Sequence, residues 1–461
     1  MSTPAYDPAA RRLTFSDRVR AFADGSDTPR KYLERCLETI AAREPVVQAW
    51  VCTNVDGARA AADEAGARYK AGRPLSGVDG CPIGVKDLIA TKDMPTEMGT
   101  PAMKGRVTNE DSSSVQALRR GGAVILGKLV TTEMGMSHPG PTTNPWDPAR
   151  TPGGSSSGSA AAVAADTVPV ALGTQVGGSI IRPSAYCGNI SLKPTQGALN
   201  RGERQGYSQS TVGPHANSIE DMWACAWQIG VDAGGDPGSP GLYGDPTPAA
   251  PRKPRRLIAV ETEGWAVADA ATHQAFEKIC ASLKQAGVEI ITRKSSAKIE
   301  AYEQSISAAG AGTAVTCGWE ARWSWRNFAE RYPGQMSASL GERLNRAEGY
   351  TLETYRTAVM RREDMRQRHA ELMVDADAVI ALSCPGIAPL SGPPGGNEVR
   401  TTGNAACNYF TSAIGMPAIT LPLMAVAGMP VGVQLCGAVH GDHALTGLAA
   451  WVLTNVKPVV V

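Results

Sequence analysis

The stretch from Thr151 to Pro194 decides the fold, and it reads TPGGSSSGSAAAVAADTVPVALGTQVGGSIIRPSAYCGNISLKP. It contains two Gly-Gly-Ser turns, which end at Ser155 and Ser179, and an apolar stretch separates them. Glycine permits backbone conformations and close approaches that a Cβ atom would block. A site that aims backbone N–H groups at a substrate oxygen needs this freedom. The two turns therefore predict that both serines reach one site.

Further short motifs lie around these turns, and their order along the chain carries a family resemblance. They are GVKD at 84–87, NPWD at 144–147, GTQVGGS at 173–179, GMPA at 415–418 and GMPVGVQ at 428–434. Together with GGSSSGS at 153–159, these motifs resemble the amidase signature family. The resemblance covers roughly residues 30 to 450, and only about 240 to 380 carries nothing diagnostic.

The resemblance implies an α/β fold, in which a large mixed β-sheet core is covered on both faces by helices. It implies one domain over 1–461, with a variable, mainly helical region at about 262–375 near the substrate pocket. The local patterns agree with this architecture. Thr28-Pro29 begins a capped amphipathic helix, and the small residues at 160–165 form a buried helix.

The resemblance also assigns three catalytic roles. Ser179 is the nucleophile, Ser155 is a bridging serine that follows a cis peptide bond, and Lys86 is the base. A serine hydroxyl is a poor nucleophile until a base takes its proton. A lysine can be that base only if burial or nearby cations lower its pKa. The apolar segment at 81–85 can bury Lys86, and strand alternation sends the neighbouring Asp87 to the opposite face.

The backbone of the second turn supplies the remaining part of the expected machinery. The resemblance places the N–H groups of Val176, Gly177, Gly178 and Ser179 around the carbonyl oxygen of the substrate, as an oxyanion hole. A serine- and glycine-rich loop alone is more often a linker or a turn. A phosphate-binding loop would need the Gly-x-x-x-x-Gly-Lys-Ser/Thr pattern, which this sequence lacks.

Arg182 is a candidate for substrate binding, because it stands three residues after Ser179. The Ile-Arg-Pro arrangement at 181–183 resembles that of some members of the family. This resemblance implies that Arg182 binds a substrate carboxylate. The alternative is that Arg182 pairs with a structural carboxylate, such as Asp166 or Asp87.

Three further residues near the serine turns are substrate-binding candidates: Ser156, Met134 and His138. A surface position is the alternative for His138. Trp319 and Trp323 share a helix face, which either packs in the core or forms a pocket wall.

Composition excludes several other classes of protein. The chain has 461 residues, and its 45 basic and 44 acidic residues give a formal net charge of +1. This balance provides no electrostatic footprint for nucleic acid or for an anionic membrane. The ten cysteines contain no C-x-x-C pair and the six histidines no H-E-x-x-H motif. We therefore expect reduced thiols, no metal and no cofactor.

Two stretches of the sequence bear on where the protein is located in the cell. The N-terminus lacks the apolar segment of a secretory signal, so we expect a cytoplasmic protein. The stretch 401–441 has no charged residue, but Pro417, Pro422 and Pro430 interrupt it. Buried strands explain this stretch better than a membrane span does.

These observations predict an amidase-type hydrolase, monomeric or homodimeric, that cleaves a C–N bond of a small amide, aryl amide or carbamate (urethane) through an acyl-enzyme. Ester hydrolysis is a possible side activity. One alternative is the glutaminase subunit of a glutamyl-tRNA amidotransferase. Those members hold the glutamine amino group with an acidic residue, and the matching stretch 403–410 has none. The other alternative is a non-catalytic binding protein on the same fold, which would be expected to lack one of the three catalytic side chains.

Overall fold

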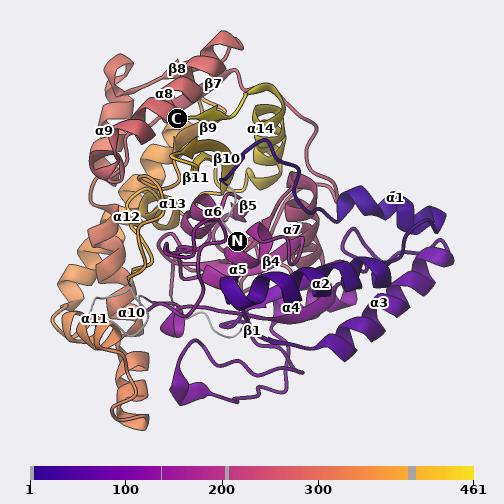
Figure 1. Cartoon of the computed structure of the whole chain (residues 1–461). Coiled ribbons are helices and arrows are strands. Elements are labelled where there is room, and N and C mark those ends of the chain that lie inside the picture. Colours follow the sequence, from indigo (N-terminus) through magenta and orange to yellow (C-terminus); the bar gives the residue numbers. More distant parts are fainter. Residues whose placement is uncertain (1–4, 137, 203–206, 393–400) are drawn as a thin grey trace.

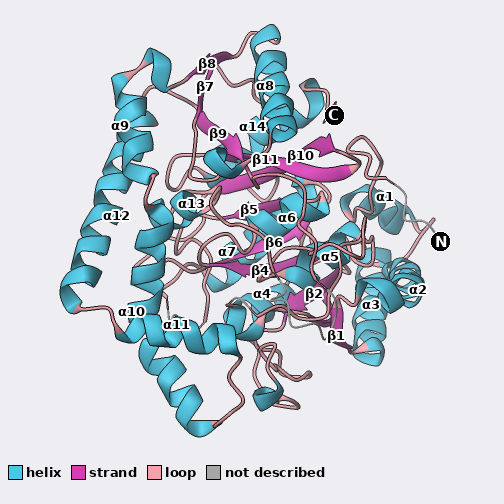
Figure 2. Ribbon diagram, turned by 60° about the vertical axis from the view of Figure 1, so that its left-hand side comes forward, coloured by secondary structure: helices cyan, strands magenta, loops and turns pink. Residues whose placement is uncertain are grey.

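The structure of the chain is a computed structural model, which describes residues 5–136, 138–202, 207–392 and 401–461. In these residues one mixed sheet runs through the middle of the molecule (Figure 2). Its strands are β1 (Trp50–Thr53), β2 (Pro82–Lys86), β3 (Val124–Leu129), β4 (Val170–Gln175), β5 (Ile190–Lys193), β6 (Thr211–Ala216), β7 (Arg256–Ala259), β8 (Glu289–Ile291), β9 (Ala378–Leu382), β10 (Ala418–Val426), β11 (Met429–Cys436) and β12 (Val459–Val460).

The strand order is β1-β3-β2-β4-β6-β5-β10-β11-β9-β7-β8, and β12 pairs with β10. Strand β2 is parallel to β3 and β4, and β7 is parallel to β8 and β9. Strand β12 is parallel to β10, and the remaining pairs are antiparallel. The sheet is therefore mixed, as expected, and the parallel triplet β3-β2-β4 carries the two motifs at 84–87 and 173–179 on adjacent strands.

Helices cover the sheet, and Figure 1 colours them by their position in the sequence. The α-helices are α1 (Ser16–Asp24), α2 (Pro29–Val47), α3 (Val55–Lys70), α4 (Ser113–Arg120), α5 (Ser157–Ala164), α6 (Ile181–Cys187), α7 (Ile219–Ala233), α8 (Ala270–Gln285), α9 (Ala297–Ile306), α10 (Ala309–Arg331), α11 (Ala338–Glu348), α12 (Leu352–Leu372), α13 (Tyr409–Ile414) and α14 (Asp442–Asn455). Short 3₁₀ helices are η1 (Pro101–Met103), η2 (Glu133–Gly135), η3 (Trp265–Val267) and η4 (Arg293–Ser295).

Separate hydrophobic clusters join these helices to the two faces of the sheet. One cluster contains Trp223 of α7, Phe276 of α8 and Leu448 of α14 together with strand residues. A second cluster contains Leu33 of α2 and Val163 of α5. A third joins α9, α12 and α13 to β7 and β9. The expected α/β fold, with helices on both faces of a mixed sheet, is confirmed.

Helix α5 shows why the serine run needs small residues. All eight of its residues are buried. A Cβ atom on Gly158 would lie 2.5 Å from the backbone oxygen of Ala49 and 2.5 Å from the backbone nitrogen of Val130. The close approach of two backbones therefore excludes any side chain at this position. The packing holds the start of α5, and with it the first serine turn, against the sheet.

The region at about 262–375 contains the helices α8 to α12. It also contains the strand β8, which lies at the edge of the sheet. Helices α9 to α12 form one side of the molecule in Figure 2. Within the described residues, no helix combines the length and the apolar character needed to cross a membrane.

Candidate active site

The amine of Lys86 lies among three hydroxyl groups at the end of β2. Its Nζ is 2.7 Å from Oγ of Ser155, 3.0 Å from Oγ of Ser156 and 2.9 Å from Oγ1 of Thr174. The backbone oxygen of Thr174 is 3.3 Å away. The Lys86 side chain is 0% exposed, so these contacts replace water completely. The structure thus brings Lys86, Ser155 and Ser156 together.

The surroundings of Lys86 favour its neutral form. Burial, and in addition the positive charge of Arg182, hold the pKa of Lys86 well below its usual value. The neighbouring carboxylate does not oppose this shift by direct contact. Asp87 instead lies 3.2 Å from Nζ of Lys128, on the adjacent strand β3. Burial therefore favours the neutral amine, which is the form that can accept a proton.

The first serine turn leads directly from an extended loop into α5. The peptide bond between Gly154 and Ser155 is cis, which is the geometry that the resemblance implied. Ser156 is the N-cap residue of α5, and its Oγ also lies 3.2 Å from the backbone oxygen of Thr174. The turn is thereby fixed to β4 on one side and to Lys86 on the other.

The second serine turn is held by side chains that bind its carbonyl oxygens. Gln209 donates from Nε2 to the oxygen of Val176 at 3.0 Å, and Ser412 donates to the oxygen of Gly177 at 3.1 Å. In a trans peptide unit the N–H points opposite to the C=O. The N–H groups of Gly177 and Gly178 therefore point away from these two anchors. Within the described residues, the N–H groups from 176 to 179 donate no hydrogen bond.

Two glycines of this turn are required by close neighbours. A Cβ atom on Gly177 would lie 2.9 Å from the ring of Tyr409, and one on Gly178 would lie 2.7 Å from Oδ1 of Asn408. Gln175 fixes the end of the turn, because its Oε1 accepts a hydrogen bond from the N–H of Ile180 at 2.8 Å. The turn thus has one conformation that its neighbours determine.

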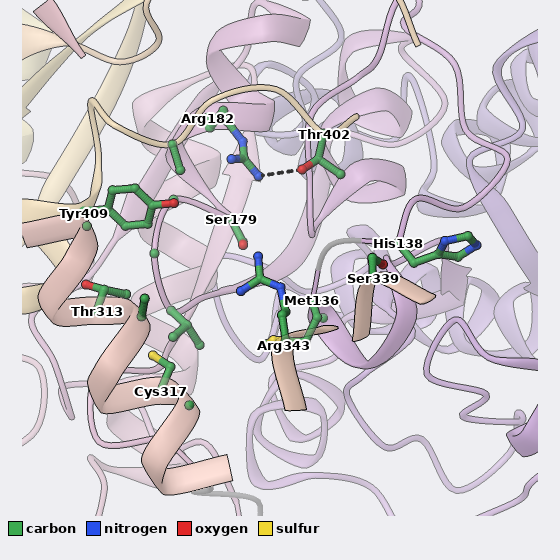
Figure 3. A pocket seen from close by; sticks show the side chains of 18 of the residues that line it. Met136, His138, Ser179, Arg182, Thr313, Cys317, Ser339, Arg343, Thr402 and Tyr409 are labelled. Carbon is green, nitrogen blue, oxygen red and sulfur yellow. Dashed lines mark hydrogen bonds between the residues drawn. The ribbon is translucent and has the colours of Figure 1, made fainter. Parts of the chain in front are cut away.

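Two cavities meet at Ser179. One, of about 510 Å³, is lined by Ser179 together with Arg182, Arg343 and Arg346, and we call it the arginine cavity (Figure 3). His138 lies on its wall. The other, of about 440 Å³, we call the methionine cavity. It is lined by Ser155, Ser179, Met98, Met134 and Met136, with further apolar and charged residues. Met134 and His138, both substrate-binding candidates, therefore lie beside Ser179 in different cavities.

Arg182 is 7% exposed and directs its guanidinium at the backbone. Its Nη1 donates to the oxygen of Gly403 at 3.2 Å, and its Nη2 donates to the oxygen of Gly154 and to Oγ1 of Thr402. Arg182 therefore ties the first serine turn to the segment that precedes α13.

The expected alternative for Arg182, an ion pair with Asp166 or Asp87, is wrong. Asp166 lies 3.1 Å from Arg12. Asp87 pairs with Lys128. The reason is that Arg182 occupies the first turn of α6 and faces the serine turn, where carbonyl oxygens rather than carboxylates are available.

His215 is a buried histidine near this site, and it serves a different serine. Its Nδ1 lies 2.7 Å from Oγ of Ser184. Burial lowers its pKa to about 3. The ring is therefore neutral at neutral pH.

Several residues of the site gave no signal in the sequence. Gln209 and Arg343 approach from distant segments, so no local pattern could reveal them. Trp325, 2% exposed, lines the arginine cavity. Trp323 is 62% exposed, and Trp319 stacks on Tyr355, so neither contributes to that wall.

A family model decides the identity. The model described as Amidase matches residues 31–446. The chain belongs to the amidase family. Its relatives include one subunit of the glutamyl-tRNA(Gln) amidotransferase of Chloroflexus aurantiacus, which is 31% identical over 464 residues, with 94% of each chain covered.

Solved structures agree with this amidase fold. A solved amidase has 26% identity, a TM-score of 0.82, and coverage of 96% of this chain and 100% of its own. A chain from a vestigial protein complex, which reveals the evolutionary origins of an s-triazine catabolic enzyme, also has 26% identity and a TM-score of 0.82. It covers 97% of this chain and 100% of its own. The mixed sheet and its helices are thus those of amidase signature structures.

The buried amine of this amidase predicts a pH-dependent stability difference. The pKa of Lys86 is lower in the folded than in the unfolded chain. The free energy of unfolding of the wild-type protein therefore falls by up to about 1.4 kcal/mol for each pH unit between about 10.4 and the lower folded-state pKa. Lys86→Met removes this loss. The stability of the variant relative to wild type should therefore be larger at pH 7 than at pH 10, and should fall as the pH rises between these values.

Urea denaturation of both proteins at several pH values measures this difference. Lys457→Met, at an exposed position, corrects for the loss of one lysine charge. A Lys86→Met difference that does not change with pH would show that the folded protein does not disfavour the ammonium form.

Proposed function

We propose that this amidase-family protein hydrolyses the C–N bond of a small amide, aryl amide or carbamate through an acyl-enzyme. The observation that carries the proposal is the 2.7 Å contact between Nζ of Lys86 and Oγ of Ser155 in a fully buried site. A neutral amine beside a hydroxyl is a general base, and burial supplies the neutral form. Small molecules are the proposed partners, because the two cavities hold about 510 and 440 Å³.

The first step forms the acyl-enzyme. Oγ of Ser179 attacks the substrate carbonyl carbon, while its proton passes to Ser155 and the proton of Ser155 passes to Lys86. The carbonyl oxygen becomes an anion and accepts hydrogen bonds from the N–H groups at 176–179. Their availability in the described residues, and the anchors on Val176 and Gly177, support this role. Removing one such donor typically costs about 10²- to 10³-fold in rate.

The next steps release the products and restore the enzyme. The tetrahedral intermediate collapses as its C–N bond breaks, and Ser155 gives a proton to the leaving nitrogen and receives one from Lys86. Water then attacks the ester carbon of the acyl-enzyme and loses a proton by the same route. The resulting second tetrahedral intermediate collapses as its C–O bond to Ser179 breaks, and Ser179 regains a proton from Lys86 through Ser155. These steps use no metal or cofactor. The cytoplasmic location of the protein and its monomeric or homodimeric state stay predictions.

A glutaminase function is the second candidate, because the amidotransferase subunit of Chloroflexus aurantiacus is 31% identical over nearly the whole chain. A free glutamine brings an ammonium group into the pocket. The described residues that line the arginine cavity include three arginines and no Asp or Glu. The arginines can attract the α-carboxylate of glutamine, but no Asp or Glu among the described lining residues pairs with its ammonium group. The cavity therefore favours the free-standing hydrolase.

The nucleophile is tested by substitution and by labelling. Ser179→Ala should reduce anilide turnover by at least about 10⁴-fold and should abolish labelling by a fluorophosphonate, because the acyl-enzyme needs this oxygen. Ser157→Ala is the matched control, since Ser157 lies in the same run but its Oγ donates to the oxygen of Val130. It should retain both properties. Labelling at another serine would contradict the assignment.

The two candidate functions differ in their action on glutamine. We expect the purified chain to hydrolyse p-nitroanilides and to release no ammonia from free glutamine above the Ser179→Ala background. A coupled ammonia assay at millimolar glutamine measures this. Efficient glutamine hydrolysis, with little action on anilides, would favour the glutaminase function instead.

A further inference from the structure

The methionine cavity, which contacts Ser155 and Ser179, also contacts the side chain of Arg106. This half-buried side chain has its Nη1 atom buried without a hydrogen-bond partner, and within the described residues it forms no ion pair. Its backbone is fixed, because its N–H donates to the oxygen of Met103 at 3.0 Å and its oxygen accepts from the N–H of Thr96 at 2.8 Å. A guanidinium keeps its charge and has five N–H donors, so a ligand that supplies an acceptor is favoured beside it.

Three other charged residues are found among the described lining residues of the methionine cavity, and two of them have partners of opposite charge. Arg201 forms an ion pair with Asp236 at 2.5 Å, and Asp111 forms one with Arg119 at 3.1 Å. The third, Glu110, is exposed, so water and salt screen its charge. The half-buried guanidinium is therefore the least compensated charge in the described lining of this cavity.

The N-terminus of α4 lies in the same wall. Its N-cap residue Ser112 and its first residues Ser113 and Ser114 all line the methionine cavity. The N–H groups of Ser113 and Ser114 donate no hydrogen bond within the described part of the chain. The start of a helix carries a partial positive charge, which adds to the charge of Arg106. Both groups therefore favour an anion in this cavity.

This wall is fixed to the segment that follows the catalytic lysine. The N–H of Ser112 donates to the oxygen of Ala90 at 3.0 Å, and Ala90 stands four residues after Lys86. The hydroxyl of Ser113 donates to Oδ1 of Asn200 at 2.8 Å, and that of Ser114 to its backbone oxygen at 2.7 Å. The start of α4 is therefore held in place before any ligand binds.

The catalytic serines indicate which part of a substrate enters this cavity. Ser179 lines both cavities, whereas Ser155, which protonates the leaving nitrogen in the proposed function, lines the methionine cavity and not the arginine cavity. The leaving amine therefore belongs in the methionine cavity. The side chains of Met98, Met134 and Met136 in its wall suit an aromatic ring, because a thioether sulfur makes favourable contacts with aromatic groups.

We propose that the leaving group is an aromatic amine that carries a carboxylate, such as an aminobenzoate, and that Arg106 binds this carboxylate. The assignment of the leaving group rests on the proposed function. A planar guanidinium binds a carboxylate through two parallel hydrogen bonds, which a neutral group cannot match. The bond that breaks is the amide C–N bond to this amine, and the amine leaves with the proton of Ser155.

The test compares two anilides that differ only in the group on the leaving ring. p-Acetamidobenzoate carries a carboxylate, and p-nitroacetanilide carries a neutral nitro group of the same shape. The two amines differ in reactivity, so the informative quantity is how substitution changes the ratio of their kcat/KM values. Arg106→Gln should lower this ratio, carboxylate over nitro, by at least about tenfold, mainly through KM, because the charged contact is lost. An unchanged ratio would overturn the proposal.

Lys104→Gln is the matched control, because Lys104 is exposed two residues before Arg106, outside the lining of both cavities, and the substitution removes the same charge. It should leave the ratio unchanged. Arg106→Lys, which retains the charge without the two parallel donors, should restore only part of the ratio. A fall in the ratio for Lys104→Gln as large as that for Arg106→Gln would contradict a local role for Arg106.

A binding measurement separates this proposal from the hydrolytic function. Calorimetry with p-aminobenzoate and Ser179→Ala protein should give a dissociation constant at least about tenfold lower than with Ser179→Ala, Arg106→Gln protein. Equal affinities would overturn carboxylate recognition even if anilides are hydrolysed. Binding that depends on Arg106, without turnover of any anilide, would instead retain the anion site but refute the proposed hydrolysis and with it the assignment of the leaving amine.

Discussion

The contact between the Lys86 amine and the Ser155 hydroxyl depends on the absence of water, and much of the fold serves to exclude it. Lys86 ends a strand that lies between two parallel neighbours, β3 and β4. Helix α5 covers that point with small side chains, because Gly158 lets its backbone approach Val130 and Ala49. An ammonium group is costly in such surroundings, whereas a neutral amine surrounded by hydroxyl groups is not. The packing that excludes water from this part of the core is thus also what favours the neutral form of Lys86.

A second constraint acts on the backbone of the other serine turn. Gln209 and Ser412 bind carbonyl oxygens, and Gln175 binds the N–H groups that follow. These anchors come from the loop before β6, from α13 and from the end of β4. Each is held by its own packing, so the N–H groups are oriented before any ligand arrives. Such preorganisation avoids the cost of reordering dipoles when charge develops.

The sequence could predict the parts of the site that local chemistry determines. The glycines of the two serine turns, the lysine after an apolar strand and the small residues of α5 all lie in short, ordered motifs. The same motifs also predicted the mixed sheet and its helices, through the family resemblance that they carry. Arg343, Gln209 and Trp325 were not, because each reaches the site from a segment whose position depends on packing far along the chain. The partners of Arg182 were mispredicted for a related reason. A charged side chain suggests an ion pair, whereas the buried turn offers backbone oxygens.

The central claim is that Lys86 is a neutral amine in the folded protein, and direct titration of its side chain tests it best. The measurement follows the ¹³Cε resonances of labelled lysines by NMR from pH 5 to pH 10, with Lys86→Met protein to identify the signal. The account predicts that the Lys86 resonance changes to that of the neutral amine well below the usual lysine pKa of about 10.4. A Lys86 resonance that remains that of an ammonium group up to pH 10 would contradict the account.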